Sequence, residues 1–394
     1  MSLESYNVRP VWAEISLDRL SHNCREVRRI TPRSAAIMAA VKADAYGHGA
    51  PMAAKTFLKN GATSLAVANL DEAVELRNNG VKAQILVLGY IQKHLYTRML
   101  RHGVTPTIYQ VEQARSLSET AQEIGEEAKI HVKLDTGLGR LGFPASPEAV
   151  EAVEKIVSLP GIMVEGIYSH FATAYEADKT YTRVQFNRFM ATVEGLESRG
   201  VEIPVKHISN SAALIDFPEY SLDMVRPGSA LYGLHPGKDA EHTRIDSKIC
   251  MTLKAKPALI KTVPKGAGIS YGLVFKTERE SRIATLPIGY ADGYRRSLTN
   301  KGQVAINGVR APVVGRVCMD QCMVDVTDIE DLKDDDEVVL FGDGSDNSPH
   351  IEEVAEWAGS INEEIVCNVS RRVPRVYLRG GEVVAVRDYL NPEA

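Results

Sequence analysis

The chain has 394 residues, too many for one ordinary hydrophobic core, so two domains are expected. Its 44% hydrophobic and 25% charged residues are typical of a soluble globular protein. A net charge of −5 without a basic run argues against nucleic acid or an anionic membrane surface as a partner. No signal peptide or membrane-spanning run is visible, and the five cysteines are scattered, which predicts a cytoplasmic protein without disulfides.

Apolar or β-rich runs alternate with amphipathic helical patterns over the first 245 residues. The expected strands cover 35–41, 64–69, 84–90, 105–109, 129–135, 163–171, 206–210 and 223–226. Helices are expected over 16–31, 48–60, 71–79, 92–102, 111–126, 147–158 and 179–199, with Ser16 as the first N-cap. This alternation predicts an α/β fold with an N-terminal (β/α)8 TIM-like barrel over 1–245; a doubly wound open sheet is the alternative.

The pattern becomes strand-rich from residue 246 onward and predicts a C-terminal, mostly-β domain over 246–394. Expected strands cover 249–263, 281–288, 303–306, 309–318, 322–326 and 337–341, and one helix covers about 350–364. Asn307-Gly308 and Gly380-Gly381 are hairpin turn signals. The extended segment Tyr6–Ile15 could pair with either domain, and residues 1–14 are candidates for pairing with the second.

Polar residues close several of the expected barrel strands, at the ends where barrels carry their functional side chains. The first strand ends at Lys42, which either leaves the core for solvent or is a desolvated amine that forms a Schiff base; its surroundings leave both open. The later strands end at Asp135 to Arg140, at His170, at Ser209 to Ser211 and at Arg226 to Ser229.

Each of these residues also has an ordinary structural interpretation. His170 alone is usually a hydrogen-bonded core histidine, and Arg140 a surface cation. Ser211 is most simply the N-cap of a helix over 212–217, although helix N-termini also bind phosphate. Because barrels commonly bind phosphate after strands seven and eight, Ser211, Gly228 and Ser229 together with Lys42 indicate pyridoxal phosphate.

Ordered motifs along nearly the whole chain resemble those of one family. AVKADAYGHG around Lys42 resembles the cofactor-lysine signature of the alanine racemases, which are fold-type III enzymes that depend on pyridoxal phosphate. The resemblance continues in KLDTGLGRLGF (133–143), YSHFATA (168–174), NSAA (210–213), VRPGSALYG (225–233), ISYG (269–272), PIGYADG (287–293), GRVCMDQCMVDV (315–326) and RRVPRVY (371–377).

The resemblance implies an isomerase that interconverts L- and D-alanine with two bases. Lys42 matches the lysine that carries the cofactor as an aldimine and serves the D-face. Tyr271 matches the L-face tyrosine supplied by the partner subunit, which implies an obligate head-to-tail homodimer. A phenol with an ordinary pKa near 10 is a poor base, so His170 and Arg226 match a relay that favours its phenolate.

Further residues match cofactor and substrate contacts of the family. The phosphate site of the family is matched by Tyr46, Ser211, Gly228 and Ser229. Arg226 matches the arginine that faces the pyridine nitrogen in the family. Arg140 and Met319 match residues that contact the substrate carboxylate. Tyr290 and Asp320 match residues of the substrate entry path. Lys133 matches a lysine that many family members carry as a carbamate. The family role would be D-alanine biosynthesis for the peptidoglycan of the cell wall.

One departure and three alternatives remain open. Relatives often have tyrosine where this chain has Arg371, so a broader range covering alanine and serine is an alternative. An amino-acid decarboxylase of similar architecture would carry Cys-Asp-Gly, whereas Cys318 precedes Met-Asp-Gln. A non-catalytic carrier of pyridoxal phosphate would lack the β domain. Cys318 and Cys322 have no second cysteine pair nearby, so no metal site is expected.

Overall fold

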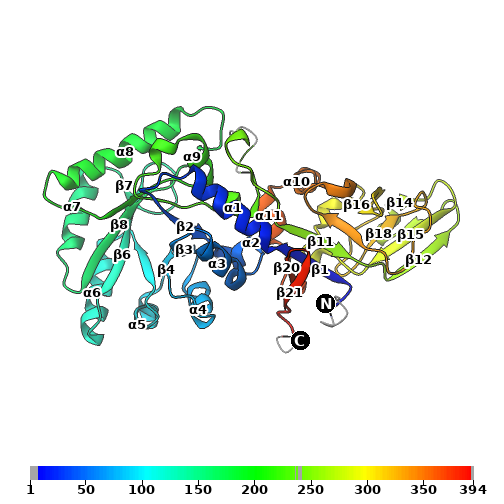
Figure 1. Ribbon diagram of the computed structural model, residues 1–394, viewed down its shortest axis with the longest axis horizontal. Helices are drawn as coiled ribbons and strands as arrows, with labels where there is room; N and C mark the ends of the chain where they lie inside the picture. The colour runs from blue at the N-terminus through cyan, green and yellow to red at the C-terminus, as the bar shows by residue number, and fades with distance from the viewer. Residues whose placement is uncertain (1–7, 236, 238–241, 392–394) are drawn as a thin grey trace.

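The computed structural model describes residues 8–235, 237 and 242–391 and consists of a barrel and a β-rich part. Figure 1 shows the barrel on the left, with helices around its strands, and the β-rich part on the right. The two termini of the described chain both lie beside the β-rich part. This arrangement confirms the predicted fold class.

Parallel strands form the barrel in the order β10-β2-β3-β4-β5-β6-β8-β9. They are β2 (Ala36–Ala40), β3 (Ser64–Val67), β4 (Gln84–Val87), β5 (Thr105–Ile108), β6 (Ala128–Asp135), β8 (Ile162–Tyr168), β9 (Val205–His207) and β10 (Met224–Val225). The short β7 (Phe143–Pro144) pairs with β6 outside this order. All eight strands expected in the first 245 residues are confirmed, although several are shorter.

The barrel closes between β9 and β10. The amide of Asp223 donates to the carbonyl of Lys206 at 3.1 Å, and the amide of Arg226 donates to the carbonyl of Ser209 at 2.9 Å. On its other side β10 pairs with β2. The last two strands therefore bring their polar ends next to the end of β2, where Lys42 lies.

Amphipathic helices cover the barrel as predicted. They are α1 (Leu17–Ile30), α3 (Ala50–Lys59), α4 (Leu70–Asn78), α5 (Tyr96–Arg101), α6 (Val111–Ile124), α7 (Pro147–Val157), α8 (Thr180–Glu197) and α9 (Ser211–Asp216). The hydroxyl of Ser16 accepts from the amide of Arg19, which confirms the predicted N-cap of α1. The segment α2 (Lys42–Tyr46) is described with the candidate site.

The β-rich part holds one large sheet and two smaller ones. The large sheet has the order β17-β16-β19-β11-β1-β20-β21, and the small ones are β12-β15-β18 and β13-β14. Their bounds are β1 (Val11–Ser16), β11 (Met251–Ala255), β12 (Leu259–Val263), β13 (Gly268–Ile269), β14 (Phe275–Lys276), β15 (Ser281–Leu286), β16 (Gln303–Ile306), β17 (Val309–Pro312), β18 (Cys322–Asp325), β19 (Val338–Phe341), β20 (Arg375–Arg379) and β21 (Glu382–Arg387).

The N-terminal strand settles one open question. β1 pairs antiparallel with β11 and parallel with β20, so the described part of the first segment belongs to the sheet of the β-rich part. Residues 1–7 of that prediction lie outside the described residues. The boundary at 245/246 stays a prediction.

Two expected elements are each divided in the structure. The run 249–263 forms β11 and β12, which lie in different sheets, because Pro257 lacks an amide donor and interrupts the ladder. The helix over 350–364 is instead α10 (Ile351–Ala358) and α11 (Asn362–Cys367). Gly359 between them adopts φ of 64°, a left-handed cap that ends α10.

The apolar core runs through both parts. A single cluster of buried side chains extends from Val11 in β1 through Ile37 and Val132 in the barrel to Tyr377 in β20. Buried hydrophobic surface therefore holds the barrel mouth and the large sheet against each other.

Within the described residues, no helix combines the length and apolar character needed to cross a bilayer.

Candidate active site

One cavity of about 900 Å³ opens at the mouth of the barrel, between the strand ends and helices α10 and α11. Of the residues predicted from the sequence, it brings together Lys42, Tyr46, His170, Ser211, Arg226, Gly228 and Ser229. Lys42 ends the first expected strand and Arg226 the last, and both line this cavity. The rule that barrel strands present function at their C-terminal ends holds here.

The chain makes a left-handed turn at Lys42, which the sequence did not predict. Ala43, Asp44, Ala45 and Tyr46 all have φ between 53° and 55°. For residues with a Cβ this conformation costs roughly 1–2 kcal/mol each. Such a turn persists only where the surrounding structure determines it, and it directs Lys42 and Tyr46 into the same cavity.

Buried polar groups hold this turn. Nδ1 of His48 lies 3.0 Å from the carbonyl oxygen of Ala45 and 2.8 Å from that of Tyr46, so it carries the proton and donates to both. Burial lowers the pKa of His48 to about 4, which keeps the ring neutral. A carboxylate oxygen of Glu72 accepts from the amide of Ala43 at 2.7 Å.

The C-terminal hairpin clamps the same turn from the other side. Nε of Arg375 donates to the carbonyl of Gly47 at 2.9 Å, and the hydroxyl of Tyr389 donates to the carboxylate of Asp44. Gly47 and Gly49 are needed for this approach: a Cβ at Gly47 would lie 2.3 Å from the carbonyl oxygen of Val366.

Cations crowd the cavity and the barrel beneath it. Burial, then the charge of Arg140, lowers the pKa of Lys42. Burial, then Arg226 and Arg140, lowers the pKa of Lys133 to about 7. Ion pairs between described residues include none of these four cations. The site therefore contains amines with lowered pKa values and cations that form no ion pair among the described residues.

Arg226 is buried and held by a fixed set of partners. Its Nη2 donates to the carbonyl of Ser169 at 2.7 Å and lies 3.4 Å from Nδ1 of His170, and its Nη1 lies 2.6 Å from Nδ1 of His207. Burial lowers the pKa of Arg226 to about 10, so the guanidinium stays protonated at neutral pH. His170 lies half-buried beside it, and desolvation followed by the charge of Arg226 lowers the pKa of His170 well below its ordinary value.

Hydroxyl groups gather where the sequence predicted a phosphate. Tyr46, Ser211 and Ser229 line the cavity, and a Cβ at Gly228 would lie 2.4 Å from the hydroxyl oxygen of Tyr46. The hydroxyl of Ser211 accepts from the amides of Gly228 at 2.9 Å and of Ala230 at 3.3 Å. Its own proton stays available for a further acceptor.

The N-cap interpretation of Ser211 is wrong. Asn210 caps α9, because its side-chain oxygen accepts from the amide of Ala213 at 2.9 Å. Ser211 is the first residue of the helix, and its hydroxyl turns toward the loop after β10 instead. Sequence reasoning favoured serine although asparagine is an equally good cap.

Four glutamates line the cavity and oppose a bound anion: Glu352, Glu353 and Glu356 of α10 and Glu363 of α11. Glu363 of α11 lines the wall near Lys42 and Ser229, and burial raises the pKa of its carboxyl. A protonated Glu363 could donate to an anion, whereas an ionised one would pair with Lys42. Sequence reasoning missed Glu363 because it lies inside the range 350–364, over which one continuous helix was expected.

The remaining predicted site residues lie away from this cavity. Tyr271, Met319 and Asp320 line a separate surface cavity of about 530 Å³ in the β-rich part. Tyr271 is 72% exposed and Met319 54% exposed, which is unusual for such side chains. Tyr290 lies beside them, since its amide donates to the carbonyl of Cys318 at 3.0 Å.

Arg140 and Arg371 are both exposed. Arg140 follows β6 close enough to act on the charges of Lys42 and Lys133. Arg371 instead places its guanidinium 5.6 Å from the ring centre of Tyr389 and does not line the barrel-mouth cavity. The structure thus gives Arg371 a contact with Tyr389 and no place in the lining of the barrel-mouth cavity.

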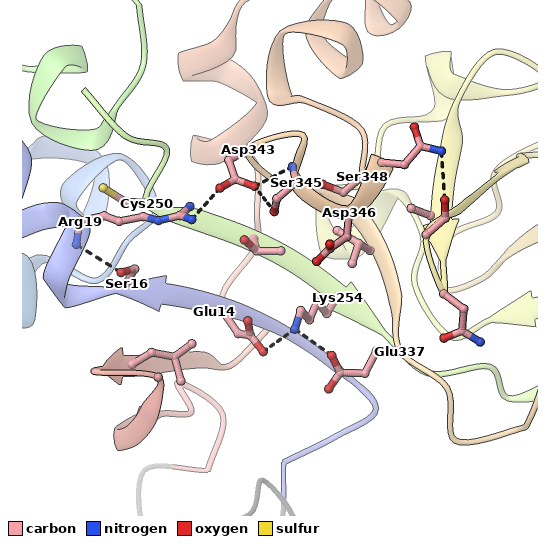
Figure 2. Close-up of a pocket in the computed structure, with 18 of the residues that line it drawn as sticks. Glu14, Ser16, Arg19, Cys250, Lys254, Glu337, Asp343, Ser345, Asp346 and Ser348 are labelled. Atoms are coloured by element: carbon pink, nitrogen blue, oxygen red, sulfur yellow. Dashed lines mark hydrogen bonds and ion pairs between the residues drawn. The ribbon is translucent and has the colours of Figure 1, made fainter. Parts of the chain in front are cut away.

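A second cavity of similar size, about 860 Å³, lies on the large sheet of the β-rich part (Figure 2). Here the charged groups are paired. Figure 2 shows Nζ of Lys254 between Glu14 and Glu337, at 3.0 Å and 2.7 Å, and Arg19 lies 2.6 Å from Asp343. This groove was not predicted from the sequence.

Comparison with protein families gives two matches that together cover most of the chain. Residues 15–236 match the model of the alanine racemase N-terminal domain, and residues 250–377 match the model of the alanine racemase C-terminal domain. The two matched segments follow each other in the order of the barrel and the β-rich part.

Individual relatives are similar over nearly their whole length. Alanine racemase from Clostridium tetani is 49% identical over 385 residues, covering 98% of this chain and 99% of the relative. Alanine racemase from Methanococcus maripaludis is 49% identical over 369 residues, covering 94% and 99%.

Solved structures agree with the fold. Alanine racemase from Clostridium difficile superimposes with a TM-score of 0.93 at 42% identity, covering 97% of this chain and 99% of that chain. The enzyme from Bacillus anthracis with bound L-Ala-P gives a TM-score of 0.91 at 38% identity, covering 97% and 98%.

Proposed function

The chain belongs to the alanine racemase family, and from this premise we propose that it interconverts L-alanine and D-alanine with pyridoxal phosphate as its cofactor. The observation that carries the proposal is the partly buried Lys42, which shares one cavity with a protonated arginine and several hydroxyl groups. An amine with a lowered pKa is suited to covalent attachment of an aldehyde and to proton transfer.

The donor set fits the cofactor. Lys42 would hold it covalently, the hydroxyls of Tyr46, Ser211 and Ser229 would bind its phosphate, and Arg226 would contact its ring nitrogen. Pyridoxal phosphate, when bound, withdraws electrons from the substrate and makes the hydrogen on the α-carbon acidic. Because Arg226 stays protonated and can only donate, it would leave the ring nitrogen without a proton of its own.

Racemisation needs one proton removed from one face of the α-carbon and another delivered to the opposite face. The ε-amine of Lys42 accepts or returns the proton on the D-face, and burial supports its neutral, basic form. We infer that the phenol of Tyr271 serves the L-face. Arg226 is assigned to the positive environment that favours its phenolate, and the neutral His170 to the relay between the two.

The two bases lie in different cavities of one chain, so a complete site needs a second copy. We infer a head-to-tail homodimer in which the exposed Tyr271 and Met319 of each chain close the barrel mouth of the other. Arg140 and the backbone at Met319 would then hold the substrate carboxylate. Tyr290 and Asp320 would border the entry path.

Lys133 is suited to carry a carbamate. Its pKa of about 7 leaves much of the amine neutral, which is the form that attacks carbon dioxide. The reaction forms an N–C bond, releases one proton and produces an anion beside Arg226 and Arg140. An intact mass equal to that of the unmodified chain in bicarbonate buffer would argue against this modification.

The decisive test is chiral analysis of products from L-alanine, with exchange of the α-hydrogen measured in D2O. Racemisation with exchange supports the proposal. Release of CO2 would indicate a decarboxylase, and absence of any product would indicate a non-catalytic carrier. Mixing inactive Lys42→Ala and Tyr271→Phe chains should restore one intact site per heterodimer. A full-activity monomer would contradict the shared site.

The cellular role follows from the product. We infer that D-alanine from this enzyme supplies peptidoglycan synthesis. Expression in a bacterium that requires added D-alanine should remove that requirement, and the Lys42→Ala chain should not.

A further inference from the structure

A row of buried side chains connects Arg226 to the interior of the barrel. Nη1 of Arg226 lies 2.6 Å from Nδ1 of His207, and Nε2 of His207 lies 2.8 Å from Nδ1 of His131. Nε2 of His131 then faces the carboxylate of Glu165 at 3.6 Å. These residues come from different strands, β6, β8 and β9, and from the end of β10.

The direction of every proton in this row follows from its first member. A guanidinium can only donate, so Nδ1 of His207 must accept and its proton lies on Nε2. Nδ1 of His131 must therefore accept in turn, and its proton lies on Nε2, aimed at Glu165. Burial lowers the pKa of both histidines, which keeps each ring neutral with one donor and one acceptor.

The surrounding packing fixes the two rings. Tyr168 stacks on His207 with ring centres 4.8 Å apart and planes 12° apart. A Cβ at Gly166 would lie 2.6 Å from the ring of His131, so this glycine provides the space that the ring occupies. The β6–β8 register shifts between Ile130 and His131, next to Glu165.

The last contact is the longest, and the carboxylate at its end favours the same proton positions as the guanidinium at the other end. Nε2 of His131 is buried, and within the described residues it has no hydrogen-bond partner closer than Glu165. Gln84 donates to the same carboxylate and holds it in place. If Glu165 were apolar, His131 could place its proton on Nδ1, and His207 would then present a proton to Arg226, donor against donor.

We propose that Glu165 and His131 are positioning residues that set the tautomer of His207 and thereby hold Arg226 in the barrel-mouth cavity. The row places a carboxylate two imidazoles away from Arg226, so the arginine is oriented without a counter-ion touching it. The proposal rests on the proposed function only in assigning Arg226 to the cofactor; the tautomers are a property of the chain alone.

The tautomers can be read directly by nitrogen NMR of histidine-labelled protein without cofactor, assigned with His131→Gln and His207→Asn variants. We expect both rings to be neutral with the proton on Nε2. Glu165→Met should give His207 a population protonated on Nδ1, whereas Glu165→Gln, which keeps an acceptor oxygen, should not. Glu154→Met, an exposed glutamate of α7, is the matched control.

Binding of pyridoxal phosphate supplies the second measurement. Glu165→Met should weaken it about tenfold, because Arg226 then faces a fraction of His207 rings protonated on Nδ1, and Glu165→Gln should restore it to within about twofold of the wild type. Gly166→Ala, which displaces the ring of His131, should resemble Glu165→Met.

The outcomes separate this inference from the proposed function. A wild-type His207 protonated on Nδ1, or a charged His131, overturns the inference even if no variant folds. An unchanged His207 tautomer in Glu165→Met also overturns it, whatever the enzyme does. Coupled tautomers in a protein that neither binds pyridoxal phosphate nor racemises alanine would uphold the inference and reject the function.

Discussion

The barrel-mouth cavity and the groove on the large sheet have similar volumes, but their cations differ in whether they form ion pairs. In the groove, Lys254 is bound between two carboxylates, and although burial acts against its charge, Glu14 and Glu337 raise its pKa. In the barrel mouth, Lys42 and Lys133 lie among other cations, and both pKa values are lowered. Size alone therefore does not distinguish a binding site from a groove between ion-paired strands.

The difference shows what an incomplete charge balance indicates. A buried cation without a protein counter-ion is unfavourable, so it persists where an external anion or a chemical role compensates. The groove needs neither because its two lining cations, Arg19 and Lys254, are both paired with carboxylates of the chain. Replacing one lysine in each region should consequently change different properties of the protein.

The largest effect is expected at Lys42. Lys42→Ala removes the covalent anchor and one of the two bases, and kcat for alanine should fall by at least about 10³-fold. The melting temperature without cofactor should change little, because no ion pair between described residues is lost. Loss of the absorbance band of bound pyridoxal phosphate near 420 nm is the direct measurement. Lys55→Ala, on the exposed face of α3, is the control.

Lys133→Met should stabilise the protein without cofactor. The folded-state pKa of about 7 lies below the unfolded value, so the unfolded chain binds more protons between about pH 7 and 10, and wild-type stability rises with pH there. The full shift corresponds to about 5 kcal/mol; with relaxation around the amine we expect about 2 kcal/mol at pH 7. Urea unfolding in CO2-free buffer measures the stability gained by the substitution and the pH dependence of wild-type stability. A wild-type stability that is flat over this pH range would contradict the prediction.

In the groove, replacing the lysine is expected to lower the free energy of unfolding instead of raising it. Lys254→Met leaves Glu14 and Glu337 without their shared cation, and the free energy of unfolding should fall by about 1–2 kcal/mol. Alanine racemisation should stay within about twofold of the wild type. Lys265→Met, at an exposed position of the β-rich part, should change neither quantity. Loss of activity without loss of stability would show that the groove takes part in the reaction.

The smallest effect is expected at Arg371. Because its guanidinium lies over Tyr389 and outside the barrel-mouth cavity, Arg371→Tyr should leave the ratio of kcat/KM for L-alanine and L-serine within about twofold. Steady-state rates with both substrates measure it. A tenfold change in the ratio would restore the idea that this position sets substrate range.

Local signals were enough to predict the barrel strands and the residues that close them. Each strand is an apolar run bounded by polar or turn residues, and the polar residue at its end marks the barrel mouth. Long-range effects were not predictable in this way. Nothing in Ala43 to Tyr46 indicates positive φ, since the conformation depends on Glu72, His48 and the C-terminal hairpin.

Residues inside the barrel were missed for a related reason. His131 and His207 are polar residues within expected strands, and a strand pattern shows neither which face points inward nor which histidines meet. Glu165 lies within the expected strand 163–171 and was not singled out. The signal that could have found them is the alternation in β6, which places His131 on the same face as Lys133.

The left-handed turn also bears on when the enzyme becomes competent during its synthesis. Arg375 and Tyr389, which hold Gly47 and Asp44, follow them in the chain by 328 and 345 residues and are therefore synthesised much later. A nascent barrel has all its strands but lacks the clamp that directs Lys42 into its mouth. Lys42 is thus placed only after the C-terminal hairpin has been synthesised, and we expect a chain truncated before this hairpin to lack the turn that directs Lys42 into the cavity.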